Sequence, residues 1–223
     1  MKLSDETVRV LKNFTTINQS LLFSAGNTIK TMSAQKTVIS KVKLEESFPF
    51  EFGIYDLNQF IGVLSLFKEP ELDFEEKYVT IKDSSVSSNY FYTSKDMILV
   101  APEKDLDMAN RPVTFSLRSE DIKGIMQAAN VLQLPEIVIN GDGKNITMSA
   151  NDIKNTTSNN FTKHVGESSA EFNLVLKVEN LKLLQLNYDV SIRFEPAMVE
   201  FSSSDQEIKY WVAGEHGSVY NGE

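Results

Sequence analysis

Four cationic side chains stand on the polar faces of segments whose apolar residues have a helical spacing. They are Arg9, Lys12, Lys123 and Lys182. Their neighbours on these faces are mostly Asn, Gln and Ser, and acids are nearly absent there after the first turn. A thin cationic, hydrogen-bonding face can hold a phosphate backbone loosely without reading bases. The pattern alone leaves open that these are ordinary solvated helix faces.

Residue types that support metal or nucleophilic chemistry are scarce in this chain. There is no cysteine, which excludes disulfides, thiolate zinc sites and cysteine nucleophiles. The two histidines, His164 and His216, lie apart and cannot anchor a recognisable metal cluster. The run Asn140-Gly141-Asp142-Gly143 is a strong hairpin signal and lacks the terminal glutamate of a calcium loop. We therefore expect no catalytic residues, no metal and no cofactor, in a protein that is not an enzyme.

The charge balance limits the kinds of partner that the chain can bind. A net charge of −9 argues against an ordinary nucleic-acid binder, because such proteins gain most of their affinity by neutralising phosphates. It does not exclude a chain that keeps its few cations on one surface and its acids elsewhere. No apolar run approaches the ~20 residues of a membrane span, and the N-terminus lacks the apolar stretch of a signal peptide. We expect a cytoplasmic protein without membrane contact.

The two halves of the chain resemble each other. Thr-Met-Ser-Ala occurs at residues 31–34 and again at 147–150. Further similarities keep an offset of about 115–120 residues, which is far longer than a solenoid repeat. We predict two similar domains, at residues 1–100 and 112–223. The segment between them, residues 101–111, is acidic with prolines near its ends, and we interpret it as a connector.

The spacing of apolar residues predicts an α+β fold in which each domain backs two helices with antiparallel sheets. Helices are expected at residues 4–17, 56–67, 119–132 and 178–186. Strands are expected at residues 21–24, 28–32, 37–44, 48–55, 78–82, 89–93, 96–100, 113–117, 160–165, 170–176, 188–194, 198–202, 208–213 and 218–220. Ser4 is the expected N-cap of the first helix.

Several runs of residues resemble one known family in the same order along the chain. The first is Leu11-Lys12-Asn13-Phe14, followed by Thr16-Ile17-Asn18. The most specific is Ile54-Tyr55-Asp56-Leu57-Asn58, followed by Phe60, Gly62 and Leu64-Ser65-Leu66. Val100-Ala101-Pro102, Asn180, Lys182 and Asn187-Tyr188 continue the similarity. By these residues the chain resembles the DNA sliding clamps of T-even-type bacteriophages, which are DNA polymerase processivity factors.

The resemblance implies a DNA-clamp fold and a homotrimeric ring of six similar domains around double-stranded DNA. Helices line the hole of such a ring, so Arg9, Lys12, Lys123 and Lys182 would face the DNA without reading its sequence. The implied partners are the replicative DNA polymerase, an ATP-driven clamp loader and possible transcription factors. The implied location is the cytoplasm of the infected bacterial host. Topological binding would also reconcile DNA contact with the negative charge.

The resemblance further implies that strand edges pair between subunits. The candidate edge in the first half consists of Met97, Ile98, Leu99 and Val100. The candidate edge in the second half lies within Phe161–Val165 and includes Phe161, Lys163, His164 and Val165. Pairing would both associate the subunits and hide exposed edges.

The family's partners bring short peptides with hydrophobic anchors to a pocket beside the connector. The candidate lining is Leu106, Met108, Tyr210, Trp211 and Val212. Ordinary core or connector packing explains the same residues equally well.

Two other functions remain open on the residues alone. One is an oligomeric β-rich structural or interaction protein that uses the same edges and never encircles DNA. The other is a carboxylate-based hydrolase, which would require an acid pair with perturbed pKa values in a cleft.

Overall fold

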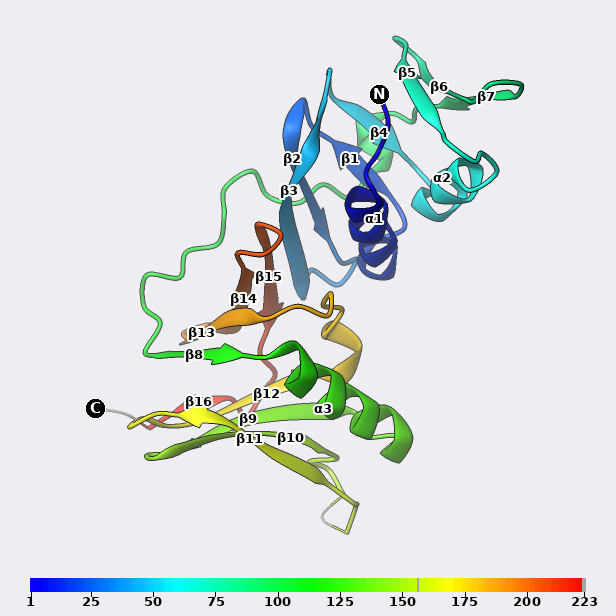
Figure 1. Ribbon diagram of the computed structural model, residues 1–223. Helices are drawn as coiled ribbons and strands as arrows, with labels where there is room; N and C mark the ends of the chain where they lie inside the picture. The colour runs from blue at the N-terminus through cyan, green and yellow to red at the C-terminus, as the bar shows by residue number, and fades with distance from the viewer. Residues whose placement is uncertain (156, 222–223) are drawn as a thin grey trace. The chain divides into compact units, whose positions relative to one another are not determined.

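The computed structural model of the protein describes residues 1–155 and 157–221. The chain divides into two compact units, residues 1–103 and 104–223. They run from blue to green and from green to red in Figure 1. The division falls inside the segment for which the sequence predicts a connector. Within the described residues, no helix is long and apolar enough to cross a membrane.

The first unit combines two α-helices with short antiparallel sheets. Its elements are α1 (Asp5–Ile17), β1 (Leu21–Phe23), β2 (Gly26–Met32), β3 (Val38–Phe48), β4 (Phe52–Ile54), α2 (Leu57–Leu64), β5 (Glu71–Phe74), β6 (Tyr78–Lys82), β7 (Ser87–Phe91) and the 3-10 turn η1 (Lys95–Met97). Strand β1 pairs with β4, β2 pairs with β3, and β5, β6 and β7 form a sheet in that order. Helix α1 buries Val10, Leu11, Phe14 and Ile17, the apolar stripe expected from the sequence.

Both helices of the first unit begin at side-chain caps. The Ser4 hydroxyl accepts a hydrogen bond from the Thr7 amide at 3.2 Å, and the Asp56 carboxylate accepts one from the Gln59 amide at 2.9 Å. Glu46 of β3 accepts hydrogen bonds from the Ser4 amide and the Thr7 hydroxyl. A carboxylate at this end also interacts favourably with the helix dipole. These contacts explain why α1 starts after Ser4, as predicted.

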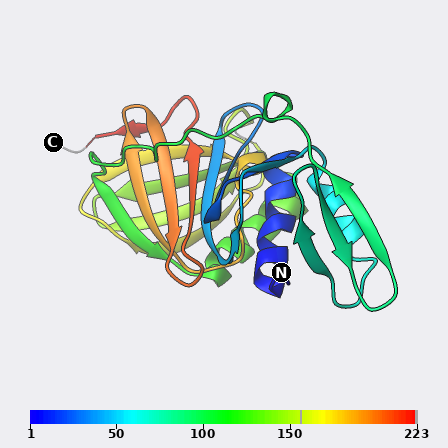
Figure 2. The same ribbon diagram turned by 90° about the horizontal axis from the view of Figure 1, so that it is seen from above.

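The second unit packs one long helix against a five-stranded antiparallel sheet. Its elements are β8 (Val113–Leu117), α3 (Ser119–Leu132), β9 (Glu136–Asp142), β10 (Asn145–Asn151), β11 (Phe161–Glu167), β12 (Glu171–Lys177), the 3-10 turn η2 (Val178–Asn180), β13 (Tyr188–Phe194), β14 (Ala197–Ser203), β15 (Ile208–Ala213) and β16 (Val219–Tyr220). The five-stranded sheet has the order β11-β10-β9-β12-β16. Strands β8, β13, β14 and β15 pair in that order, and Figure 2 shows the strands of this unit side by side.

The helix predicted at residues 178–186 is absent, so the described part of the second unit has one α-helix and a short 3-10 turn instead of two helices. Two tyrosine hydroxyls occupy the backbone groups that a helix would use. The Tyr188 hydroxyl donates to the Leu184 carbonyl at 2.7 Å, and the Leu184 amide donates to the Tyr210 hydroxyl at 3.4 Å. Tertiary contacts therefore override the helical spacing of the leucines.

The strand predicted at residues 96–100 is also wrong. Residues 95–97 form η1, in which the Ile98 amide donates to the Lys95 carbonyl at 3.0 Å. Only Ile98 of the apolar run is buried, and a Cβ added at Gly53 would lie 2.5 Å from its Cδ1 atom. Ile98 therefore packs on Gly53 of β4 through its side chain and takes no part in strand pairing. The strands expected from the sequence also omit β5.

Candidate functional sites

Helix α1 presents two of the four candidate cations at the surface. Arg9 and Lys12 are exposed, on the side opposite the buried residues of the helix. The Arg9 guanidinium contacts the Glu6 carboxylate at 3.1 Å. Exposed pairs of this kind contribute only about 0.2–1 kcal/mol, so Arg9 can exchange Glu6 for another anion at small cost. Lys12 has no ion-pair partner among the described residues.

The other two candidate cations lie in the second unit on different kinds of backbone. Lys123 is exposed on α3, away from the buried Ile125. Lys182 was expected on a helix, but it follows η2 on irregular chain and is half-buried. Lys12 and Lys123 therefore offer the most accessible charge of the four.

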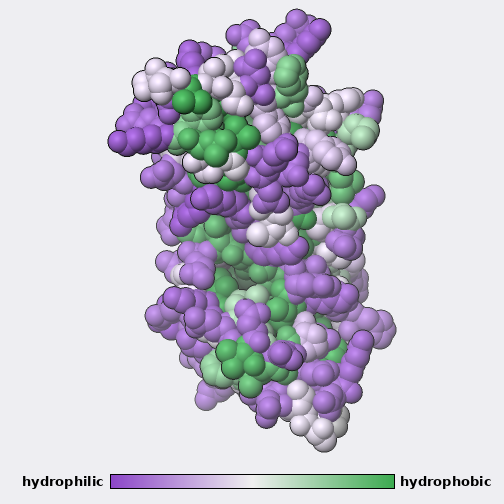
Figure 3. Space-filling model, turned by 90° about the vertical axis from the view of Figure 1, so that its right-hand side faces the viewer, coloured by the Kyte–Doolittle hydropathy of each residue, from purple (hydrophilic) through white to green (hydrophobic). Residues whose placement is uncertain are grey.

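Figure 3 shows one face of each unit in a space-filling view. Hydrophilic residues dominate this side of each unit, and smaller hydrophobic patches interrupt them. Exposed apolar side chains near the helix ends include Leu66, which follows α2, and Val131 on α3. A mainly polar helix face agrees with loose contact to a polyanion more than with a tight cationic groove.

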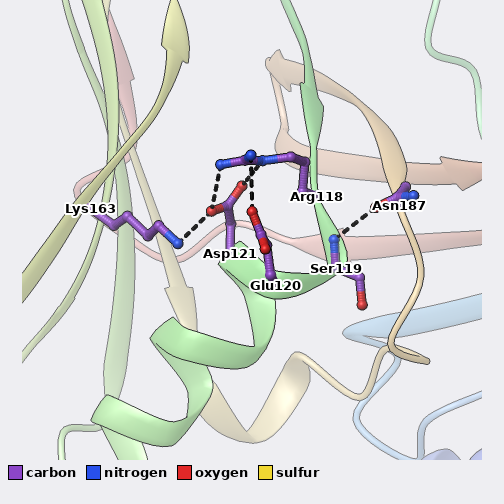
Figure 4. A network of polar contacts seen from close by, with 6 residues as sticks. All are labelled: Arg118, Ser119, Glu120, Asp121, Lys163 and Asn187. Atoms are coloured by element: carbon purple, nitrogen blue, oxygen red, sulfur yellow. Dashed lines mark hydrogen bonds and ion pairs between the residues drawn. The ribbon is translucent and has the colours of Figure 1, made fainter.

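A polar network joins the start of α3 to strand β11 (Figure 4). The Asp121 side chain is 3% exposed, and its carboxylate contacts Lys163 Nζ at 2.6 Å and Arg118 Nε at 3.1 Å. Arg118 also contacts Glu120 at 2.9 Å. Burial raises the pKa of Asp121, but the hydrogen bonds from Lys163 and Arg118 outweigh it, and the pKa lies below its usual range. Asp121 is therefore a buried, ionised anchor.

The same end of α3 receives its cap from a distant segment. The Arg118 side chain makes no cap hydrogen bond, and the Asn187 side-chain carbonyl instead accepts from the Ser119 amide at 2.9 Å. Asn187 lies in the irregular stretch that precedes β13. An amide oxygen at this position satisfies one of the free amides of the first turn.

Strand β11 is an edge of the five-stranded sheet. Its neighbour is β10, and no other described strand pairs with it. The register with β10 shifts between Ile146 and Thr147, so β11 carries a bulge near Val165. Phe161 is 41% exposed and His164 is exposed, whereas Lys163 turns toward Asp121. Of the residues predicted on this edge, Lys163 thus forms an ion pair within its own unit.

The candidate edge of the first unit differs from the prediction. Met97, Leu99 and Val100 are exposed on η1 and the chain after it, but they belong to no strand. The three-stranded sheet has two outer strands within the described part of the chain. Leu72 of β5 exchanges hydrogen bonds with Met1, whereas β7 pairs with β6 only and leaves its other side open. Phe91 of β7 is 67% exposed. The sequence placed a strand close to β7, at residues 89–93, but did not identify it as an edge.

The connector side of the second unit contains a cavity of about 310 Å³, lined in part by Leu106, Met108 and Trp211. Trp211 is 2% exposed, and its indole Nε1 has no hydrogen-bond partner among the described residues. Tyr210 and Val212 are fully buried on the opposite face of β15, because strand side chains alternate. The structure therefore brings together three of the five predicted pocket residues.

Charged groups form the rim of this cavity. Glu200 lies opposite Trp211 in the β14–β15 register and contacts Lys209 Nζ at 3.6 Å. Arg111 and Asp105 line the same cavity. The pocket therefore has an apolar floor, an unpaired buried donor and a charged rim, features that suit an apolar side chain carried by a polar chain.

Within the described residues, no cluster of three or more His, Asp or Glu side chains could hold a metal ion. His216 lies in the segment between β15 and β16. The network around Asp121 was not foreseen, because Asp121 and Lys163 are far apart in the sequence and only the fold brings them together.

Comparison with protein families identifies both halves. Residues 4–99 match the family described as "DNA polymerase processivity factor", and residues 114–216 match "gp45 sliding clamp, C terminal". The sliding clamp of Vibrio phage KVP40 is 34% identical over 202 residues, which cover 86% of this chain and 90% of that protein. The sliding clamps of Escherichia phage RB69 and Enterobacteria phage T4 are each 26% identical over 227 residues, covering 99% of this chain and 100% of theirs.

Solved structures show the same fold at low sequence identity. A. fulgidus PCNA, in a complex with the C-terminal region of FEN-1, aligns with a TM-score of 0.69 at 14% identity, covering 97% of this chain and 98% of that one. PCNA from Entamoeba histolytica aligns with a TM-score of 0.66 at 13% identity, covering 96% and 97%. These alignments confirm the α+β clamp fold that the sequence predicts.

Proposed function

The chain belongs to the sliding-clamp family of DNA polymerase processivity factors, and from that premise we propose how its parts serve the clamp. It is a DNA sliding clamp that tethers the polymerase, and as a processivity factor it is not an enzyme. The observation that carries this function is the 34% identity to a phage sliding clamp along 86% of the chain. The alternative of an interaction protein that never encircles DNA is not favoured.

We propose that three copies form a ring around duplex DNA in the cytoplasm of the infected bacterial host. An ATP-driven clamp loader would place the ring on DNA, and transcription factors would be further partners. Arg9, Lys12, Lys123 and Lys182 would face the duplex. Because Lys12 and Lys123 are exposed and Arg9 is paired with Glu6, the first two would make most of the phosphate contacts.

The proposed subunit contact is edge-to-edge strand pairing between copies. Strand β11 offers the edge from Phe161 to Val165, and β7 supports the role of partner edge because its own sheet leaves one side open. Met97, Leu99 and Val100 stay candidates as exposed apolar side chains, not as a strand, and Ile98 is buried within its unit. Pairing of two open edges satisfies backbone groups that would otherwise face solvent.

Retention on closed DNA tests the clamp function. Labelled protein is loaded onto nicked circular duplex with the phage clamp loader and ATP, washed at high salt, and then treated with a restriction enzyme. A topological clamp stays on the circle through the wash and leaves when the circle is opened. Loss from the intact circle, or equal retention on linear DNA, would contradict the proposal.

We propose that the cavity at Trp211 takes the hydrophobic anchor of a partner peptide. Its support is the apolar floor formed by Leu106, Met108 and Trp211 and the buried indole N–H, which a peptide carbonyl could satisfy. Trp211 is the only tryptophan of the chain, so its fluorescence reports on this cavity alone.

The peptide proposal is tested by titrating a short synthetic peptide from the phage polymerase. A saturable change in Trp211 emission is expected, and Met108→Lys should abolish the binding because it places a charge on the cavity floor. Val219→Lys, at an exposed apolar residue of β16, is the matched control and should leave binding unchanged. Peptide binding that is insensitive to Met108→Lys would place the peptide elsewhere.

A further inference from the structure

Asp121 is a buried carboxylate that bridges two elements with different roles in the proposed ring. It lies in the first turn of α3, and its contact with Lys163 Nζ at 2.6 Å is a charged tie from this helix to strand β11 (Figure 4). Hydrogen bonds between ionised groups are the strong ones. The second cation, Arg118, is 67% exposed and belongs to the entry of the same helix. Lys163 therefore provides the tie that reaches the sheet edge.

Strand β11 packs against α3 and β8, but its outer edge has no strand partner among the described residues. It pairs with β10 on one side only, and the bulge near Val165 interrupts that pairing. Its first residue, Phe161, is 41% exposed and so anchors the strand weakly. An edge strand with a bulge tends to bend and twist locally. The Asp121–Lys163 contact falls on the stretch before the bulge, where a second chain would have to pair.

We propose that Asp121 is a positioning residue for subunit assembly, which holds the Phe161–His164 edge of β11 against α3 in the shape that a second copy of this chain pairs with. The inference rests on the proposed ring. Asp121 makes no contact with the other copy and acts through Lys163.

The test compares variants by mass photometry or sedimentation over a range of protein concentrations. Asp121→Asn and Lys163→Gln should each raise the concentration at which half the chains are assembled by about tenfold. Lys163→Arg keeps the cation and should assemble nearly as the wild type does. Glu120→Gln is the matched control. It removes the other carboxylate paired with Arg118, an exposed one, and should leave assembly unchanged.

Two further measurements separate positioning from loss of folding. The double variant should assemble no worse than Asp121→Asn alone, because Asp121→Asn already breaks the contact that Lys163→Gln removes. Amide exchange should accelerate in β11 while α3 stays protected. Lys163→Gln leaves Asp121 paired with Arg118, so it decides the question even where Asp121→Asn fails to fold.

The outcomes distinguish this inference from the proposed function. A wild-type protein that never assembles would overturn the ring and this inference together. A wild-type ring with unchanged assembly of Asp121→Asn and Lys163→Gln would overturn the positioning role alone. Equal weakening by Glu120→Gln would also overturn it, because the effect would then come from general charge loss.

Discussion

Replacing Lys12 and Lys123 by glutamine should lower the affinity for DNA and make that affinity less dependent on salt concentration. Both side chains are exposed, and Lys12 has no ion-pair partner among the described residues. Each phosphate contact contributes about 0.9 to the slope of log affinity against log salt. A ring of three copies carries three of each lysine, and one to three of them contact a phosphate at once. Each substitution should therefore reduce the magnitude of the slope by about 1 to 3.

Arg9→Gln should have a smaller effect than either lysine substitution. The Arg9 guanidinium must first leave Glu6, which it contacts at 3.1 Å. The exposed pair is worth about 0.2–1 kcal/mol, and this cost reduces the net gain from a phosphate contact. The ranking of the three variants thus follows from their surroundings and not from their charge, which is the same.

The assay measures binding to a short labelled linear duplex by fluorescence anisotropy. The salt concentration is varied between about 50 and 200 mM, a range over which phosphate contacts change the affinity strongly. Lys144→Gln, in the exposed turn between β9 and β10, is the control with the same charge loss. Equal slopes for wild type and the Lys12/Lys123 double variant, or an equal decrease for Lys144→Gln, would refute the assignment of these helices to DNA.

Two predictions concern the stability of the second unit. The pKa of Asp121 is lowered in the folded state, so its stabilising contribution is complete above the unfolded pKa of about 3.9 and is lost as pH falls from there through the folded pKa. Urea midpoints of wild type and Asp121→Asn should therefore differ at pH 7 and begin to approach each other only below about pH 4, and a constant gap would contradict the pairing. Gly141→Ala should destabilise by about 1–3 kcal/mol in denaturant titration, because its Cβ would lie 2.3 Å from the Phe172 ring. Gly124→Ala, with open space on α3, should instead stabilise by about 0.5–1 kcal/mol, and equal effects of the two would show that the close approach at Gly141 has no energetic weight.

Local signals in the sequence sufficed for the helices and strands whose pattern agrees with their tertiary surroundings. Helix α3 was predicted to its terminal residues, because Ile122, Ile125 and Ala129 recur with helical period and acids occupy the first turn. The leucines at residues 181–186 have a similar spacing, yet two tyrosine hydroxyls bind the Leu184 backbone and no helix forms. That competition depends on side chains from other strands and leaves no trace in the local pattern.

The candidate sites divide in the same way. Trp211 and Met108 were expected beside a cavity because the family resemblance implies a pocket next to the connector, and both residues line the cavity in the structure. Strand alternation alone could have excluded Tyr210 and Val212 from the pocket lining, because they point to the face opposite that of Trp211. The tie between Asp121 and Lys163 could not be predicted, since it requires the packing of α3 on β11. Family resemblance supplied the ring and its partners, which no spacing of residues in this chain specifies.

The most direct test of the central claim is negative-stain imaging of the purified protein at high concentration, with and without a short duplex. The account predicts rings of three subunits with a central hole wide enough for duplex DNA, and duplex threaded through that hole. Compact particles without a hole, unchanged as concentration rises, would contradict it.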